Sequence, residues 1–173
     1  MANFLADRHE RDHEEAAWYG DRSLTLEEAL VRAMFTLNRP GVRDTHQWTY
    51  GVRDLDAIGA RLAANADALR EPADFADLYY RIERLLDLGR HAKPLLVYDV
   101  ANRIGRWLGC RPVDVWLHAG AKNGANALRP GLGRPRFRPL ADFPASMRDR
   151  LTPDRAEDFL CVVGSQLHPD LWD

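Results

Sequence analysis

The sequence predicts an all-α protein, and we expect one compact domain of six or seven helices. Apolar residues recur at the three- and four-residue spacing of helices in several segments, whereas the two-residue alternation of strands is scarce. Proline and glycine separate these segments. The sequence contains no repeat with a period of roughly 20 to 50 residues. The composition, 46% apolar and 29% charged over 173 residues, is that of a globular domain. We expect a polar segment over residues 1–22 and a single helical domain over residues 23–173.

The first predicted helix begins after Thr25 and ends before Asn38. Thr25 and Glu28 have the spacing of a capping box, in which each side chain accepts a hydrogen bond from the other residue's backbone N–H. A second helix is predicted over Asp54–Arg70, because its apolar residues follow a helical stripe and a proline comes soon after its end.

The third predicted helix has the clearest amphipathic pattern. It begins after Asp74, a favourable N-cap residue, and ends at Gly89. A fourth helix is predicted over Leu95–Leu108, although its β-branched residues leave a strand as the lesser alternative. A fifth is predicted over Pro112–Leu128, because proline is well suited to the first turn of a helix.

The last part of the chain contains a predicted loop and two further helices. Residues Arg129–Pro139 include three prolines and two glycines, which exclude a helix. Helical character returns over Pro144–Leu151. It returns again after Thr152, a cap residue followed by proline, and ends at Gly164.

Gly120 and Gly124 lie four residues apart inside the fifth predicted helix. Each costs roughly 1 kcal/mol relative to alanine, so some other interaction should offset the loss. Close packing of another helix against this face is the favoured explanation. The approach of a ligand to the backbone is the alternative.

The apolar faces of these helices predict the core. The residues expected to be buried are Leu30, Met34, Leu37, Leu62, Phe75, Leu78, Ile82, Leu85, Ile104, Leu108, Leu117, Phe159 and Leu160. The five tryptophans, which can pack in the core or stack on a ligand, are Trp18, Trp48, Trp107, Trp116 and Trp172. Trp48 follows His46 and Gln47 in a predicted loop, where it could serve either function or packing.

The net charge of −2 hides an uneven distribution. Gly89–Arg138 contains ten Lys and Arg residues against two acidic residues, so this basic half carries +8 and the remainder −10. A concentration of this kind indicates an anionic partner, and DNA or RNA is the leading candidate.

Four arginines cluster in the loop after the fifth predicted helix, with Phe137 among them. They are Arg129, Arg134, Arg136 and Arg138. Extended basic loops with an aromatic residue suit phosphate backbones and stacked bases, and Arg90 and Lys93 could add contacts. In the alternative interpretation, the loop pairs with the acidic part of its own domain. The loop could equally pair with the acidic part of a second subunit, and the chain would then be an assembly module that forms a homo-oligomer.

A different hypothesis is an enzyme that acts on a phosphorylated or nucleobase substrate. Asp99 and Arg103 are four residues apart in the fourth predicted helix, and His118 and Lys122 are four apart in the fifth. If the two helices form a hairpin, these side chains would combine an acid, an imidazole and two cations. Such a group is suited to anion binding or general acid–base catalysis. A structural salt bridge with a hydrogen-bonded histidine is the simpler interpretation.

The run from His9 to His13 matches H-E-x-x-H, the spacing with which a helix can bind zinc. Its charged neighbours leave no apolar face to bury, so we expect a solvated segment and neither metal nor other cofactor. Cys110 and Cys161 lack metal-ligand spacing and are expected to be reduced. No stretch is apolar enough for a membrane span or a secretory signal, which predicts a cytoplasmic protein without a membrane partner.

Two runs within and just after residues 88–117 carry a resemblance to known proteins. They are KPLLVYDVANRIG over Lys93–Gly105 and VWLHAG over Val115–Gly120. The segment resembles the helix-hairpin-helix region of DNA glycosylase-like proteins. It is also similar to small uncharacterised bacterial helical proteins in which such a hairpin precedes a V-Y/W-L-H-A-G helix.

This resemblance implies a hairpin of two helices whose turn amides grip a DNA phosphate. His91 and Lys93 stand where the family's turn glycines align. The resemblance further implies that Asp114 lies near the place of the family's catalytic aspartate, whereas no lysine occupies the position of its nucleophile.

Overall fold

The computed structural model describes residues 2–35, 51–86, 94–128 and 135–167. These ranges contain eight α-helices, seven of them seven residues or longer, and one two-stranded sheet, so the predicted all-α class is confirmed. We expected one domain after a polar segment. The contacts group the chain into two compact units, an N-terminal unit of Ala2–Arg111 and a C-terminal unit of Pro112–Asp173.

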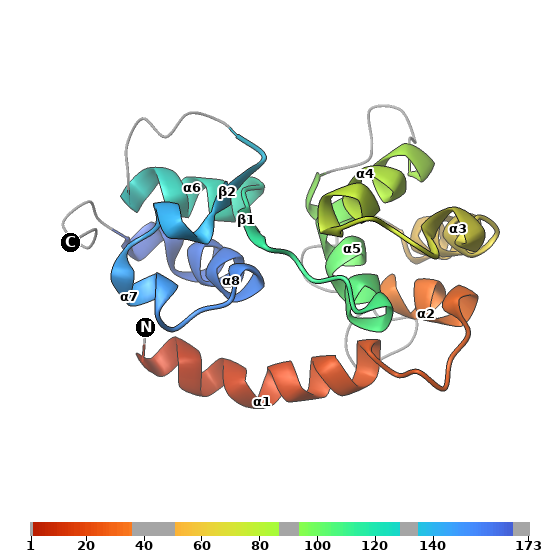
Figure 1. Ribbon diagram of the computed structural model, residues 1–173, viewed down its shortest axis with the longest axis horizontal. Helices are drawn as coiled ribbons and strands as arrows, with labels where there is room; N and C mark the ends of the chain where they lie inside the picture. The colour runs from red at the N-terminus through yellow and green to blue at the C-terminus, as the bar shows by residue number, and fades with distance from the viewer. Residues whose placement is uncertain (1, 36–50, 87–93, 129–134, 168–173) are drawn as a thin grey trace. The chain divides into compact units, whose positions relative to one another are not determined.

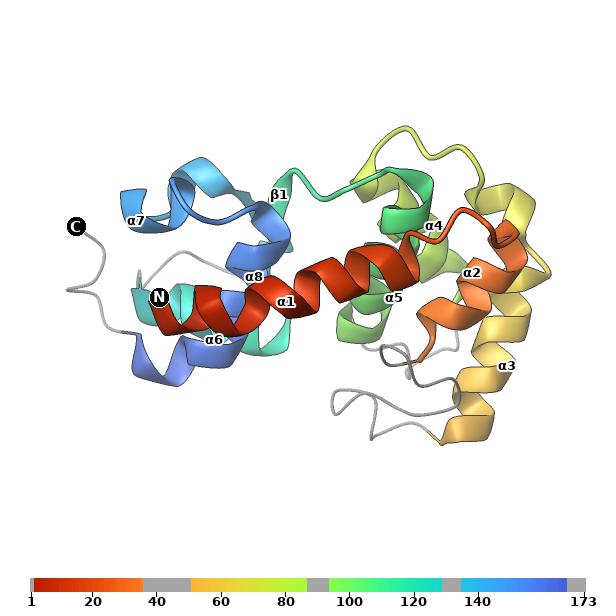
Figure 2. The same cartoon turned by 90° about the horizontal axis from the view of Figure 1, so that it is seen from below.

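The N-terminal unit is built around a central helix. Its described elements are α1 (Ala2–Tyr19), α2 (Leu26–Ala33), α3 (Val52–Ala63), the 3-10 helix η2 (Ala66–Leu69), α4 (Phe75–Leu85) and α5 (Pro94–Leu108). Helix α5 packs against both α2 and α4, and α3 packs against α2 (Figure 1). The long helix α1 contacts α5 and α2 (Figure 2). The predicted polar segment is therefore mostly helical.

Two helix starts predicted from capping residues are confirmed. Thr25 Oγ1 accepts a hydrogen bond from the Glu28 N–H at 3.3 Å, and Glu28 Oε2 accepts one from the Thr25 N–H at 2.8 Å. At the start of α4, Asp74 Oδ1 accepts from the Asp77 N–H at 2.8 Å. Each side chain satisfies a donor that helix geometry leaves without an intrahelical partner. These local contacts fix where α2 and α4 begin.

The helix predicted over Asp54–Arg70 is wrong in its second half, because α3 ends at Ala63 and η2 follows. Between them, Asn65 Nδ2 donates a hydrogen bond to the carbonyl oxygen of Arg61 at 2.8 Å. A side chain that satisfies a carbonyl of the last turn favours ending the helix at that point.

Asp77 gives the N-terminal unit a pH-dependent contact. Its pKa is lowered from 3.8, first by a hydrogen bond from Arg81 and next by one from the Ala73 N–H. The shortest Arg81–Asp77 distance is 2.7 Å, from Nη2 to Oδ2. A carboxyl group whose pKa is lowered by folding stabilises the fold above its unfolded pKa and loses this effect as the pH falls through its folded pKa.

We therefore expect Asp77→Asn to lower the urea midpoint of unfolding at neutral pH. The difference from the parent protein should shrink and vanish as the pH falls below 3.8. Urea titrations across this range test the expectation. A difference that stays constant down to low pH would contradict it.

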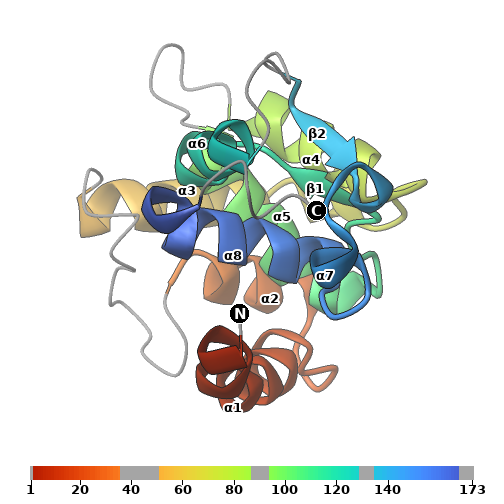
Figure 3. The same cartoon turned by 90° about the vertical axis from the view of Figure 1, so that its left-hand side faces the viewer.

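The C-terminal unit combines a small sheet with a pair of packed helices. Its described elements are β1 (Asp114–Trp116), α6 (Ala119–Leu128), β2 (Phe137–Pro139), η4 (Leu140–Asp142), α7 (Ala145–Arg148), α8 (Pro153–Val163) and η5 (Gly164–Gln166). Helix α8 packs along α6 and against β1 (Figure 3). It begins as predicted, with Thr152 at the N-cap and proline in the first turn.

The helix predicted over Pro112–Leu128 begins only at Ala119, because the preceding residues form β1 and pair with β2 in antiparallel orientation. Val115 and Trp116 are 0% and 3% exposed. A β-branched residue followed by an aromatic one fits a strand that is buried on both faces. The end of the predicted loop is likewise a strand.

The two glycines of α6 are explained by close packing, as the favoured interpretation predicted. A Cβ atom on Gly120 would lie 2.7 Å from Cys161 Sγ in α8. One on Gly124 would overlap the carbonyl oxygen of Leu160 and lie 3.1 Å from its Cα. The absence of both side chains lets the two helix backbones come together.

Most of the predicted core is confirmed, and two of its members are wrong. Ten of the thirteen expected residues are buried, with exposures between 0% and 7%. Leu85 and Leu108 lie at the last turns of their helices and are only partly buried. Leu37 lies outside the described residues. None of the described helices has the length and apolarity needed to cross a membrane.

Candidate functional site

The arginines of the basic half that lie in the N-terminal unit bind acceptors of that unit. Arg103 Nη1 donates to the carbonyl oxygen of Ala33 at 3.0 Å, and Arg111 Nη1 donates to that of Asn102 at 3.0 Å. Arg106 forms an ion pair with Glu15 at 3.4 Å. These three guanidinium groups therefore stabilise the contacts of α5. Arg90 and Lys93 lie outside the described residues, as does the turn of the implied hairpin.

The four residues of the enzyme hypothesis are divided between the two units. Asp99 and Arg103 lie on α5, where the Arg103 guanidinium also lies 5.2 Å from the centre of the Tyr19 ring. His118 precedes α6, and its carbonyl oxygen accepts a hydrogen bond from the Lys122 N–H at 3.3 Å. Each pair thus belongs to its own unit.

A buried pair of titratable side chains joins β1 and α6 to α8. His118 Nε2 lies 3.2 Å from Glu157 Oε1, and the two side chains are 5% and 10% exposed. Sequence reasoning did not identify Glu157. The signal was its place on the apolar face of a helix, one residue after Ala156 and three before Leu160. A buried carboxylate at such a position needs a partner, and His118 supplies it.

The described part of the basic loop forms an ordered strand edge. The Leu117 N–H donates to the Arg136 carbonyl oxygen at 2.7 Å, and Trp116 lies opposite Phe137 in the sheet. Their ring centres are 5.1 Å apart, so Phe137, which was expected to stack on bases, packs on the protein. The Arg136 side chain is exposed.

Arg138, at the middle of β2, forms an ion pair with Asp142 at 3.3 Å. Their side chains are 31% and 36% exposed, so the pair is accessible to solvent. Arg129 and Arg134, the other two arginines of the loop, lie outside the described residues.

The tryptophans fall into three groups. Trp116 is buried in the C-terminal unit, whereas Trp107 and Trp18 lie under the guanidinium groups of Arg22 and Arg32, at 5.1 and 4.1 Å. Those outside the described residues are Trp48, with its neighbours His46 and Gln47, and Trp172.

The H-E-x-x-H run lies in α1, where His13 is exposed. The side chain of His9 is outside the described part of the helix. No cluster of three or more His, Cys, Asp or Glu side chains that could hold a metal occurs among the side chains that the structure describes. Cys110 and Cys161 are both in the thiol form. Burial, followed by the charges of nearby aspartates, raises the pKa of the Cys110 thiol above 9.0.

Asp114, which the glycosylase resemblance implies near a catalytic position, begins β1 and lies opposite Pro139. No known protein family matches this chain, and neither a curated protein nor a solved structure does.

Proposed function

We propose that the protein binds DNA or RNA through phosphate contacts made by the basic loop of its C-terminal unit. The observation that carries this proposal is the exposure of Arg136 at the edge of a fixed strand. Arginine suits this role because its planar guanidinium group can donate two parallel hydrogen bonds to one phosphate.

Local order supports the proposal. The backbone of Arg136 is held by Leu117, and the next residue, Phe137, packs on Trp116. A side chain carried by an ordered strand loses less conformational freedom on binding than one in a flexible loop. The described end of the basic loop, from residue 135 onward, is therefore organised before a phosphate arrives.

The position of the cations also supports the proposal. Residues 112–173 contain eight basic and eight acidic residues, so their charges balance and binding must depend on where the cations lie. In the N-terminal unit, Arg103, Arg106 and Arg111 bind groups of the protein. At the strand edge, Arg136 is exposed, and the side chain of Arg138 is 31% exposed beside Asp142.

We expect Arg136→Ala to weaken binding of a labelled oligonucleotide at low salt. Because each phosphate contact releases counterions, the slope of log affinity against log salt should fall by about 1. Fluorescence anisotropy titrations at several salt concentrations measure both effects. The matched control is Arg150→Ala, which removes an exposed arginine of the same unit and should change neither.

Asp142→Asn provides a variant with the opposite expected sign. It removes a negative charge that lies 3.3 Å from Arg138, so the repulsion of a phosphate falls and affinity should rise. The proposal fails if the full chain does not bind at low salt, or if Arg136→Ala binds like the parent. If the native mass of the protein alone changes with ionic strength, the loop instead mediates association between copies of the chain.

A further inference from the structure

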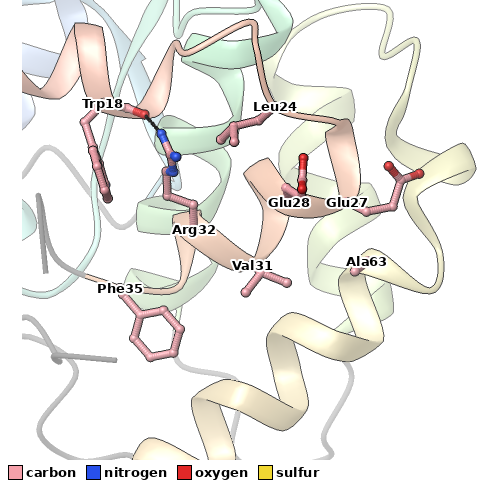
Figure 4. Close-up of a pocket in the computed structure, with 8 residues that line it drawn as sticks. All are labelled: Trp18, Leu24, Glu27, Glu28, Val31, Arg32, Phe35 and Ala63. Atoms are coloured by element: carbon pink, nitrogen blue, oxygen red, sulfur yellow. Dashed lines mark hydrogen bonds between the residues drawn. The ribbon is translucent and has the colours of Figure 1, made fainter. Parts of the chain in front are cut away.

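The N-terminal unit contains a pocket of about 470 Å³ between α1, α2 and α3 (Figure 4). Its apolar wall consists of Trp18, Leu24, Val31, Phe35 and Ala63. Small-molecule sites in proteins commonly have volumes of roughly 300–1,000 Å³ and mostly apolar walls. The pocket has the size and lining of such a site, and it takes all its residues from one unit.

The positive group of the pocket is already neutralised by the protein. Arg32 Nη1 donates to the Trp18 carbonyl oxygen at 2.9 Å and to Asp21 Oδ2 at 3.2 Å. Its guanidinium group also lies 4.1 Å from the centre of the Trp18 ring, an arrangement that Figure 4 shows in part. An anionic ligand would have to compete with Asp21 for this group.

The two acidic groups of the lining are engaged in the same way. Glu28 Oε2 accepts the capping hydrogen bond from the Thr25 N–H at 2.8 Å. Glu27 Oε1 lies 3.7 Å from the guanidinium group of Arg70. A cationic ligand would therefore have to share a carboxylate that already accepts a backbone N–H or pairs with an arginine. The pocket favours uncharged molecules.

The polar atom of Trp18 does not open into the pocket. Its Nε1 atom is buried, so a ligand in the pocket meets the apolar surface of the indole ring and not its N–H group. The wall therefore offers a ligand mainly apolar contact.

We propose that this pocket binds an uncharged and mostly apolar small molecule. The apolar wall supplies contact area, and the engaged charges disfavour ions. This activity is separate from nucleic-acid binding, because its residues lie in the other unit.

Three naphthalene derivatives test the proposal on the full chain by isothermal titration calorimetry or by ligand-observed NMR. They are 2-acetylnaphthalene, which has a carbonyl acceptor, 2-naphthoate, which is anionic, and 2-methylnaphthalene, which has no acceptor. We expect 2-acetylnaphthalene to bind about tenfold more tightly than 2-naphthoate, because the anion must compete with Asp21. Equal binding of these two, or binding of none of the three, would overturn the proposal.

Two substitutions locate the binding. Val31→Phe fills the pocket from a side chain that is 41% exposed, so it should abolish binding without unfolding the protein. Val113→Phe adds the same bulk at a position that is 76% exposed and lies in the C-terminal unit, so it should bind normally. Thermal unfolding followed by circular dichroism verifies that both variants fold. Unchanged binding by Val31→Phe would exclude this pocket.

Discussion

Replacing Gly124 with alanine should destabilise the C-terminal unit by about 1–3 kcal/mol, the range typical of overpacking. The added Cβ would overlap the carbonyl oxygen of Leu160, so α6 and α8 could not keep their present separation. At an unobstructed position inside a helix, the same substitution stabilises by up to about 1 kcal/mol. Gly124→Ala should therefore lower stability, whereas helix propensity alone would raise it.

Hydrogen exchange of the amides of α6 and α8 is a suitable measurement, because it reports on this unit separately from the other. The control is Asn123→Ala, which changes an exposed residue in the same helix and should be neutral or slightly stabilising. If these amides exchange as slowly in Gly124→Ala as in the parent protein, the two helices are not in close backbone contact.

Removing the carboxylate of Glu157 while His118 remains should also have a large effect. Glu157→Ala should cost about 3 kcal/mol or more, because breaking a buried pair leaves a polar group without its partner and creates a cavity. Glu157→Gln should cost less, since it keeps the volume of the side chain and leaves a polar group beside the imidazole. Asp149→Ala, which removes an exposed acid of the same unit, is the matched control and should be nearly neutral.

A double-mutant cycle separates the pair from its surroundings. Replacing both His118 and Glu157 with leucine should recover much of the loss, because an apolar pair of similar volume needs no partner. Urea unfolding of the parent, His118→Leu, Glu157→Leu and the double variant gives the coupling energy. Additive losses would show that the two side chains stabilise the unit independently.

The sequence predicted those parts of the fold that depend on near neighbours. The starts of α2, α4 and α8 follow from residues within one helical turn, such as Thr25 and Asp74. β1 was missed because its partner, β2, lies about 20 residues further on and looks like a loop by itself. Local propensity cannot reveal a pairing of that range, and Val115 and Trp116 become strand residues only through it.

The candidate site was predicted only in part, for a similar reason. Charge counts identified the basic half, but they do not show which acceptors a folded chain provides to Arg103 or Arg106. The basic half also crosses from one unit to the other, with five Lys and Arg residues on each side of the boundary at Arg111. Its +8 charge therefore belongs to two separate bodies. Glu157 was overlooked because its partner, His118, lies about 40 residues away in the sequence and no local pattern links the two.

The boundary between the units has a practical consequence. Arg111 is tied to α5 through the carbonyl oxygen of Asn102, and the exposed Val113 follows two residues later. A cut between these two residues would place the residues of the pocket on one fragment and the Arg136 strand edge on the other. Each proposed ligand could then be titrated against half of the protein, and any communication between the sites would appear as a difference from the undivided chain.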